Sequence, residues 1–393
     1  MKRTVVAMLV AVAAVSVLAL SQGRVAIVLD VGGRGDLSFN DMGFRGADRA
    51  TEELGWDMVE VQSASASDYL PNLRNLARTG EYDLIIPIGF LLGDALAAVA
   101  PEFPDQRFAI IDVDYITGPN IANYVFRENE VAALIGCLAA MCAAAFGCDY
   151  TGVVLGLPIP VLFHFEEGYR FGQDWGLDHY AEFCEGAAAR ARATYVGMLY
   201  NYTGTFGDIA LGKAASESML AQGAVGICSV AAGLASGIHD AVSNAHVAAG
   251  TTYGPPFYYG ADANQDWLGL GMHTLASAIK RVDIAVYEAI RSVVNGTFTA
   301  GITTLGLAEG GVAISDRSTL DEFIDFAISS AAVQESDGDT IIANWTANRA
   351  TVPDCIWDAV AALEAGILDG SIVVPTADTD DEIQDIRDRY PLE

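Results

Sequence analysis

From residue 25 onward, short apolar segments alternate with segments of helical periodicity almost without exception. Short apolar runs rich in β-branched residues predict buried parallel strands, and the amphipathic segments between them predict the helices that connect one strand to the next. The chain is therefore expected to be an α/β protein built on doubly wound parallel sheets. This pattern excludes all-helical and all-β architectures.

The pattern places each expected element on a residue range. The strands are expected at 25–30, 57–61, 83–88, 107–112, 121–126, 151–155, 194–199, 223–230, 256–261 and 311–314. The helices are expected at 40–54, 68–79, 92–100, 128–146, 165–185, 206–221, 234–248, 274–295, 318–332 and 354–366. The series restarts near Thr151, which predicts two similar Rossmann-like lobes.

A chain of 393 residues is too long for one ordinary core and fits two domains with a leader. We expect an N-terminal lobe from residues 24–126 plus 263–303, and a C-terminal lobe from residues 127–262 plus 304–375. The long helix at 274–295 would return to the first lobe, and crossover segments between the lobes would act as a hinge. Residues 376–393 are expected to be a solvated acidic tail.

Residues 1–23 have the features of an export signal. Lys2 and Arg3 precede an uncharged run from Thr4 to Leu20, which is typical of a secretory leader. The segment is predicted to be a signal peptide or an N-terminal anchor, and the protein to lie at the outer face of the cell membrane or in the extracytoplasmic space. The absence of a cysteine near residue 20 argues against a bacterial lipid anchor.

The chain is strongly acidic, with a formal net charge of −30 and an isoelectric point near 4.2. Phosphate contacts need a basic face, so this charge excludes a general nucleic-acid binder. Lysines occur only at Lys2, Lys213 and Lys280. A lysine at a predicted pocket is therefore unusual in this chain.

No residue pattern indicates catalysis, a metal or a cofactor. The six cysteines form no C-x-x-C pair, and the five histidines show no catalytic or zinc-binding spacing. No Walker motif and no G-x-S-x-G elbow occurs. We therefore predict that the protein is not an enzyme. Disulfides are possible in an exported protein, but the sequence leaves their pairing open among Cys142, Cys148, Cys184 and Cys355.

Polar and aromatic residues gather just after the predicted strands. Ligands of open α/β sheets bind at this edge, so these residues are the candidates for a binding cleft. Each candidate has a structural alternative: a phenylalanine can be core, Asp30 and Asn40 can cap a turn and a helix, and Lys280 can extend to solvent. The candidates are Asp30, Ser38, Phe39, Asn40, Phe90, Asp112, Phe206, Gly233, Asp262 and Lys280.

Seven motifs follow one another along the chain: Asp30–Asn40, Ile88–Phe90, Phe126–Glu130, Phe165–Gly172, Gly204–Asp208 with Gly212-Lys213, Gly260–Asn264 and Lys280–Asp283. In this order they resemble the basic membrane protein family, the purine-nucleoside receptor type of substrate-binding protein that serves ABC transporters. The resemblance covers residues 24–375. One departure is Ala232-Gly233-Leu-Ala-Ser-Gly237, where the family usually has a Gly-Gly-Thr-Gly-like turn.

The resemblance implies a type I periplasmic-binding fold and a ligand held in the cleft between the lobes. By this resemblance Phe39 and Phe206 would stack on the two faces of a purine base. Asp30 and Asn40 would bind the edge of the base. Asp262 would bind ribose hydroxyls, with Lys280 close to it, and Asp112 would be a further base or sugar contact.

The resemblance also implies a role and partners. The protein would capture a nucleoside, most simply a purine nucleoside, and deliver it to the permease and ATPase of an ABC importer. It would act as a monomer and without a cofactor. Because the two-lobed fold does not set specificity, two alternatives stay open: a receptor for a sugar, an autoinducer or an amino acid, or a signalling sensor on the same fold.

Overall fold

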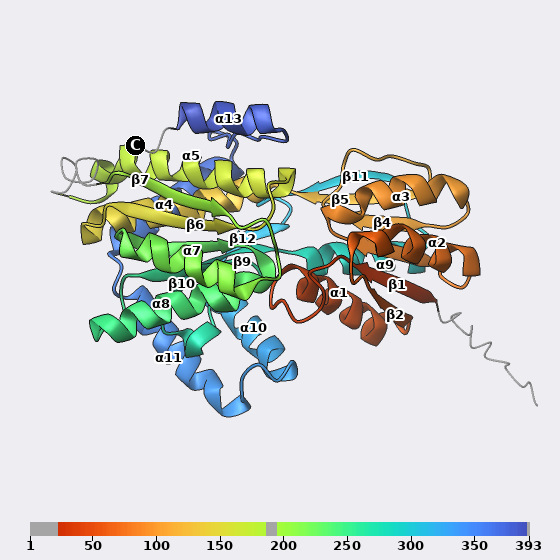
Figure 1. Ribbon diagram of the computed structural model, residues 1–393, viewed down its shortest axis with the longest axis horizontal. Coiled ribbons are helices and arrows are strands. Elements are labelled where there is room, and N and C mark those ends of the chain that lie inside the picture. The colour runs from red at the N-terminus through yellow and green to blue at the C-terminus, as the bar shows by residue number, and fades with distance from the viewer. Residues whose placement is uncertain (1–22, 186–194, 391–393) are drawn as a thin grey trace, which may run out of the picture.

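The computed structural model describes residues 23–185 and 195–390, which form two lobes, each built around a six-stranded sheet (Figure 1). The predicted leader lies outside the described residues except for Gly23, as does the first residue of the strand predicted at 194–199. All strand pairs in the first sheet are parallel. Its strands, in spatial order, are β11 (Gly301–Leu305), β5 (Ile121–Phe126), β4 (Phe108–Ile111), β3 (Leu84–Ile88), β1 (Arg24–Leu29) and β2 (Asp57–Gln62).

The second sheet repeats this topology. The orders β2-β1-β3-β4-β5 and β7-β6-β8-β9-β10 are equivalent, and only the edge strand β12 pairs antiparallel. In each sheet the order reverses beside the first strand, which creates a crevice at the carboxyl ends of the strands. The strands, in spatial order, are β12 (Val312–Ile314), β10 (Thr274–Lys280), β9 (Phe257–Asp262), β8 (Ala224–Val230), β6 (Tyr150–Leu155) and β7 (Gly197–Tyr202).

Helices cover both faces of each sheet, as the pattern predicts. Along β1, Val25, Ile27 and Leu29 face α1 and α9, whereas Ala26 and Val28 face α2 and α3. The helices are α1 (Phe39–Leu54), α2 (Tyr69–Thr79), α3 (Gly93–Val99), α4 (Glu128–Phe146), α5 (Pro160–Phe183), α7 (Ile209–Ala221), α8 (Ala235–Ala249), α9 (Val282–Val294), α10 (Arg317–Ser329), α11 (Gly338–Arg349), α12 (Asp354–Leu368) and α13 (Asp380–Arg389).

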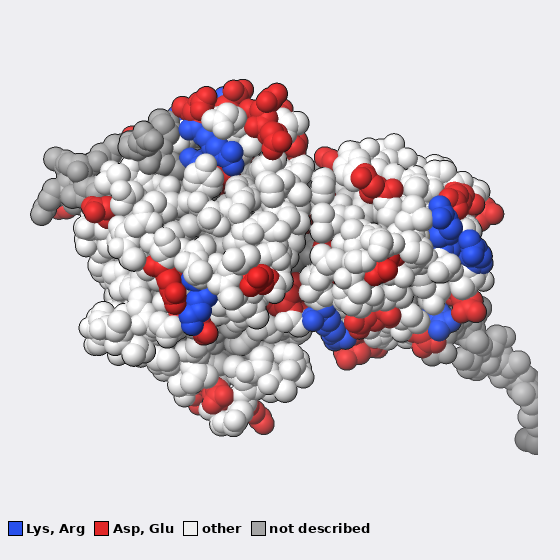
Figure 2. Space-filling view, in the orientation of Figure 1, with Lys and Arg blue, Asp and Glu red and all other residues white. Residues whose placement is uncertain are grey.

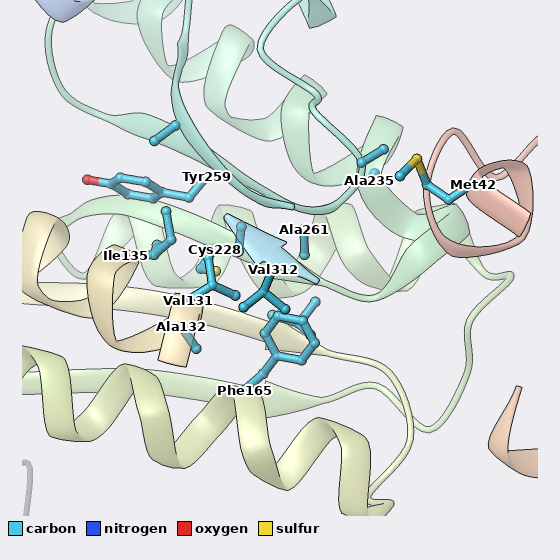
Figure 3. Close-up of a cluster of buried hydrophobic side chains, with 14 of the residues drawn as sticks. Met42, Val131, Ala132, Ile135, Phe165, Cys228, Ala235, Tyr259, Ala261 and Val312 are labelled. Atoms are coloured by element: carbon cyan, nitrogen blue, oxygen red, sulfur yellow. The ribbon is translucent and has the colours of Figure 1, made fainter. Parts of the chain in front are cut away.

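The helix α4 is apolar on all sides because it lies between the second sheet and α5 (Figure 3). The two helices approach so closely that a side chain at Gly172 would overlap the backbone of Ala133. Among the described residues, α4 is also the one helix long and apolar enough to cross a membrane. Because 78% of its most apolar window is buried inside the protein, it is accounted for as a core helix.

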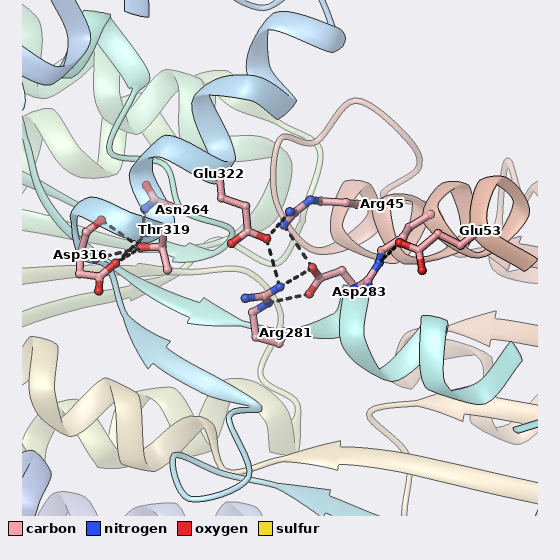
Figure 4. Close-up of polar contacts among 9 residues, drawn as sticks. Arg45, Glu53, Asn264, Arg281, Asp283, Asp316, Thr319 and Glu322 are labelled. Carbon is pink, nitrogen blue, oxygen red and sulfur yellow. Dashed lines mark hydrogen bonds and ion pairs between the residues drawn. The ribbon is translucent and has the colours of Figure 1, made fainter. Parts of the chain in front are cut away.

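Three connections cross between the lobes: β5 to α4, β10 to α9, and β11 to β12. Charged side chains join both lobes beside the second crossing (Figure 4). Arg281 donates to Asp283 at 2.8 Å and to Glu322 of α10 at 3.3 Å. Arg45 of α1 pairs with the same two carboxylates. The network ties α1 and α9 of the first lobe to α10 of the second.

The helix predicted over 274–295 is wrong in its first part, since residues 274–280 form the strand β10 of the second sheet. Every residue of β10 is buried, and its alanines and leucine are good helix formers. A place inside the sheet overrides this local preference. Two further elements, β11 and α11, have no counterpart in the prediction.

The acidic tail also differs from the prediction, since α13 packs on the second lobe instead of being solvated throughout. Ile383 and Ile386 are buried against Phe163 of α5, although acidic side chains crowd the outer face of α13 (Figure 2). The charge of the segment obscured these two isoleucines, which lie three residues apart on one helical face.

One disulfide joins the end of α5 to the start of α12. Cys184 and Cys355 are bonded with their Cα atoms 5.4 Å apart, and 171 positions of sequence separate them. Cys142 and Cys148, the other two candidates, are free. The disulfide therefore anchors the C-terminal helices to α5.

Replacing both Cys184 and Cys355 by serine is expected to lower the free energy of unfolding by about 2–5 kcal/mol. Without the disulfide the unfolded chain is no longer closed into a long loop, and its conformational entropy rises. Denaturant unfolding measures this loss. The control is Cys148→Ser, which removes a free, partly exposed thiol and should leave stability nearly unchanged. Equal stability of the double variant and the wild type would contradict the prediction.

Candidate ligand-binding site

A cavity lies between the lobes, at the carboxyl ends of the strands where both sheet orders reverse. The first lobe contributes a polar wall with two aromatic rings, and the second lobe contributes a mainly apolar wall. The first lobe's lining residues are Asp30, Gly32, Phe39, Asn40, Gly89, Phe90, Leu91 and Asp112. Those of the second lobe are Ile159, Val161, Leu162, Phe165, Phe206, Val230, Ala232, Asp262 and Lys280.

Buried carboxylates hold the loop between β1 and α1. Asp36 accepts hydrogen bonds from the backbone N–H groups of Ser38 and Asn40, both at 2.9 Å. Asp41 accepts one from Gly35 at 2.8 Å. Burial raises the pKa of Asp36 to about 7. These bonds satisfy the free N–H groups at the start of α1 and so fix the direction in which Phe39 projects.

Asp30 and Asn40 present acceptors to the cavity. Asp30 accepts from the backbone N–H of Gly32 at 2.8 Å, and burial raises the pKa of its carboxyl. The amide of Asn40 donates to Asp36 at 3.1 Å, while its Oδ1 is buried with no hydrogen-bond partner among the described residues. Asp30 therefore caps the turn that follows it, as the structural alternative predicts, and it also lines the cavity. Asp36, which sequence reasoning missed, caps α1 in place of Asn40.

Two glycines make room for the two phenylalanines that come from opposite lobes. Phe39 packs beside Gly89, the residue after β3, where a Cβ would meet the Phe39 ring at 3.4 Å and where φ is 111°. Phe206, from the loop between β7 and α7, lies over Gly156, where any Cβ would overlap its ring. The absence of side chains after β3 and β6 therefore positions both rings.

The centre of the cleft is a buried ion cluster around Lys280. Its Nζ lies 2.7 Å from Asp112 Oδ2 and 2.8 Å from Glu128 Oε1, and the residue is completely buried. The rings of Phe39 and Phe126 lie with their centroids 5.0 and 5.1 Å from the same nitrogen. Lys280 ends β10 of the second sheet and Asp112 follows β4 of the first, so this ion pair joins the lobes.

Burial and neighbouring charges together set the pKa values of Lys280 and of the acids around it. Burial raises the pKa of Asp112 to about 7, against the opposing effect of Lys280. Burial likewise raises the pKa of Asp262. For Lys280, the carboxylates of Asp112, Glu128 and Asp262 outweigh burial and raise the ammonium pKa. The lysine therefore stays charged in the closed cleft.

Asp112 and Asp262 occupy nearly equivalent places at the end of the fourth strand of each lobe, since Asp112 directly follows β4 and Asp262 is the last residue of β9. Both have left-handed backbone, with φ of 68° and 64°, a conformation that costs a non-glycine residue free energy and that concentrates at functional sites. Ser38 Oγ donates to Asp262 Oδ2 at 3.0 Å, and Gln265 Nε2 donates to the carbonyl of Leu37 at 3.0 Å. These bonds also join the two lobes.

The structure brings together eight of the ten candidate residues on the cavity wall. Ser38 reaches the site through Asp262, and Gly233 lies next to the lining residue Ala232. Lys280 sits at the end of a strand and not on a helix, and its ion partners are Asp112 and Glu128. Sequence reasoning assigned no role to Glu128, although it lies within the quoted motif Phe126–Glu130.

Sequence reasoning also missed the apolar wall, which consists of Ile159, Val161, Leu162 and Phe165. Ile159 directly precedes α5, which begins at Pro160 after β6, and the other three residues belong to the first turns of this helix. A proline at the start of a helix behind a strand end was the available signal.

Three of the five histidines lie away from the inter-lobe cavity. His239, His246 and His273 pack together by α8, with His246 and His273 stacked at a centroid distance of 4.2 Å. Burial lowers the pKa of all three. None of them lines the inter-lobe cavity. Across the described residues, no group of three or more histidine, cysteine or acidic side chains could hold a metal ion.

Two equivalent α/β lobes, crossover connections and a cleft at the paired switch points are the architecture of the periplasmic-binding type. Residues 24–336 match the family of ABC transporter substrate-binding proteins described as PnrA-like, and the chain belongs to this family. It is accordingly not an enzyme. A small-molecule ligand and a membrane permease are its partners, and it acts at the outer face of the cell membrane.

Known relatives agree with this assignment. A crystal structure of an ABC transporter solute-binding protein from Aeropyrum pernix K1 is 37% identical, covers 94% of this chain and 100% of its own, and superposes with a TM-score of 0.83. A lipoprotein of Pyrococcus horikoshii is 38% identical over 92% of this chain and 86% of its own. The nucleoside-binding protein BmpA of Lactococcus lactis is 27% identical over 90% and 89%.

Lys280→Gln is expected to lower the free energy of unfolding by about 3–5 kcal/mol at neutral pH, because it leaves buried carboxylates without their cation. Burial already raises the Asp112 pKa to about 7, and loss of the lysine raises it further; the folded-state pKa of Glu128, which Lys280 helps to lower, rises as well. Such carboxyls stabilise the protein at low pH and lose this effect as pH rises, so the deficit should grow through the region of the Asp112 pKa of about 7.

Chemical denaturation at several pH values tests this prediction. Lys213→Gln is the matched control, since Lys213 lies 3.9 Å from an exposed Asp240 and should contribute about 0–1 kcal/mol. A deficit in the Lys280 variant that does not change with pH would show that the carboxylates do not depend on this lysine.

Proposed function

We propose that the protein captures a nucleoside, in particular a purine nucleoside, in the inter-lobe cleft and delivers it to the permease of an ABC importer. The observation that carries this proposal is the pair of rings, Phe39 and Phe206, which come from opposite lobes and line one cavity. A flat heterocycle between two aromatic faces gains about 1–3 kcal/mol of stacking per ring, largely independent of which base it is.

The polar groups of the cleft complement the edges of such a ligand. Asp30 and the unpaired Asn40 Oδ1 lie on the same wall as Phe39 and can accept hydrogen bonds from a base. Asp112 and Asp262 lie beside Lys280 and can accept hydrogen bonds from ribose hydroxyls. Asp112 Oδ1 is buried with no partner among the described residues, and a donor from the ligand would remove that cost.

The charges of the cleft favour a nucleoside over a nucleotide. Among the described residues Lys280 is the one cation on the cavity wall, and both of its close partners are carboxylates. A phosphate would meet Asp30, Asp112 and Asp262 without a free cation. The name of the Lactococcus lactis relative, a nucleoside-binding protein, supports the same ligand class. We also propose that the protein acts as a monomer.

Titration calorimetry against a panel of ligands tests the proposal. The panel is adenosine, guanosine, inosine, cytidine, guanosine monophosphate, free bases, ribose and amino acids. We expect micromolar or tighter binding of purine nucleosides and at least tenfold weaker binding of the monophosphate. Binding of only sugars or amino acids would replace the nucleoside by another ligand class on the same fold.

Phe206→Ala is expected to weaken nucleoside binding by about 1–3 kcal/mol, roughly tenfold or more in affinity, because one stacking face is lost. Phe206→Tyr retains a ring and should bind nearly as the wild type does. Thermal unfolding without ligand checks that both variants fold. An alanine variant with wild-type affinity would exclude the sandwich.

A further inference from the structure

The C-terminal strap, residues 369–390, lies beyond the residues 24–336 that match the family model, yet it reaches the region of the ligand cleft. After α12 it passes α4, where the Asn129 amide donates to the carbonyls of Val374 and Pro375 at 3.2 and 2.9 Å. It ends in α13, which lies along α5 (Figure 1).

The strap is bound to α5 by a buried ion pair and by apolar contacts. Arg387 donates two hydrogen bonds to Glu166, at 2.8 and 2.7 Å, and Glu166 is completely buried. Ile383 and Ile386 pack against Phe163 on the same helix. Because the first turns of α5 carry the apolar wall of the cleft, the strap packs on the helix that supplies this wall.

A chain of polar contacts runs from the strap to the centre of the cleft. Asp378 Oδ1 lies 2.8 Å from His164 Nε2, and His164 Nδ1 lies 3.1 Å from Glu128 Oε2. The other oxygen of Glu128 lies 2.8 Å from Lys280 Nζ. The chain begins at a carboxylate whose side chain is 62% exposed and ends at a buried lysine.

The surroundings of His164 favour its charged form. Burial alone lowers its pKa, but the hydrogen bonds to Asp378 and Glu128 raise it to about 10. Glu167 also faces it from α5, and Glu382 of α13 faces Glu167. Burial raises the pKa of Glu167 to about 9, so that carboxyl is neutral at pH 7. His164 is therefore an imidazolium between two carboxylates.

We propose that the C-terminal strap sets the charge of the ligand cleft through Asp378, His164 and Glu128, with His164 as a positioning residue that supplies a second cation to the acids around Lys280. Three carboxyls, Asp112, Glu128 and Asp262, share this one lysine. A cation on the far side of Glu128 balances that residue and leaves Lys280 to favour the ionised form of Asp112, which accepts hydrogen bonds from the ligand. The proposal rests on the proposed function in taking this cleft as the binding site.

Titration of the Asp112 carboxyl by carbon-detected NMR, in the ligand-free protein, tests the proposal directly. His164→Gln removes the cation, and Asp378→Asn removes the exposed carboxylate that helps to keep His164 charged. His164→Gln should raise the Asp112 midpoint by about one pH unit, and Asp378→Asn should lower the pKa of His164 from about 10. The matched control is Asp388→Asn, the same change on the same strap at a residue that contacts Gln384 instead of His164.

Guanosine affinity, measured from about pH 5 to pH 9, gives a second readout. His164→Gln should weaken binding roughly three- to tenfold at pH 7 and move the pH profile upward, since a protonated Asp112 accepts fewer hydrogen bonds. An unchanged Asp112 midpoint in His164→Gln would overturn the proposal, as would an unchanged His164 pKa in Asp378→Asn or an affinity loss that is equal at every pH. If the wild type binds no nucleoside and the midpoints still move, the proposed function fails and the strap's effect on the cleft stands.

Discussion

The two lobes meet around one buried lysine, and the arrangement of the cleft depends on it. Lys280 comes from the second sheet. Its partner Asp112 follows β4 of the first lobe, and its partner Glu128 begins α4, directly after the crossing from β5. A buried charge without its partner costs far more than the pair gains by forming. The closed arrangement therefore needs all three groups in contact, and the left-handed backbone at Asp112 is part of the cost of placing its carboxyl there.

The repeated topology explains why so few residues are needed to build the site. Each sheet reverses its strand order beside its first strand, so the segments after β1 and β3, and after β6 and β8, converge from opposite lobes. Gly89 and Gly156 occupy two of these positions and admit Phe39 and Phe206. In Figure 3 the side chain of Met42 on α1 points toward Ala235 of α8, and both belong to one buried cluster. Apolar contact thus accompanies the polar contacts across the cleft.

Sequence patterns predicted the elements that have a clear period and failed where tertiary position decides. The expected strands from 25–30 to 256–261 all have counterparts, because apolar runs bounded by polar turns are local signals. The strand β10 was mistaken for a helix, since Thr274–Lys280 is buried on both faces and contains helix-forming residues. In α13, two isoleucines decide the packing of an otherwise acidic segment.

The candidate site, too, could be predicted only in part from the sequence. Residues that directly follow strands could be named from the sequence, since the carboxyl edge of a parallel sheet is where ligands bind. Partners across long separations could not: Asp112 and Lys280 lie 168 positions apart, and His164 and Asp378 lie 214 apart. No local pattern records such a pairing. The protonation of Glu128, which lies in the motif Phe126–Glu130, therefore depends in part on His164, which lies outside every motif.

Selectivity in such a cleft follows from acceptors that the protein leaves without donors. Asn40 Oδ1 and Asp112 Oδ1 are both buried and have no partner among the described residues. An unpaired buried acceptor costs about 1–3 kcal/mol, and a ligand donor at that place recovers the cost. A ligand of the same shape that lacks the donor leaves the cost in place. In the proposed complex the rings would provide affinity for flat ligands in general, and the unpaired oxygens would discriminate among them.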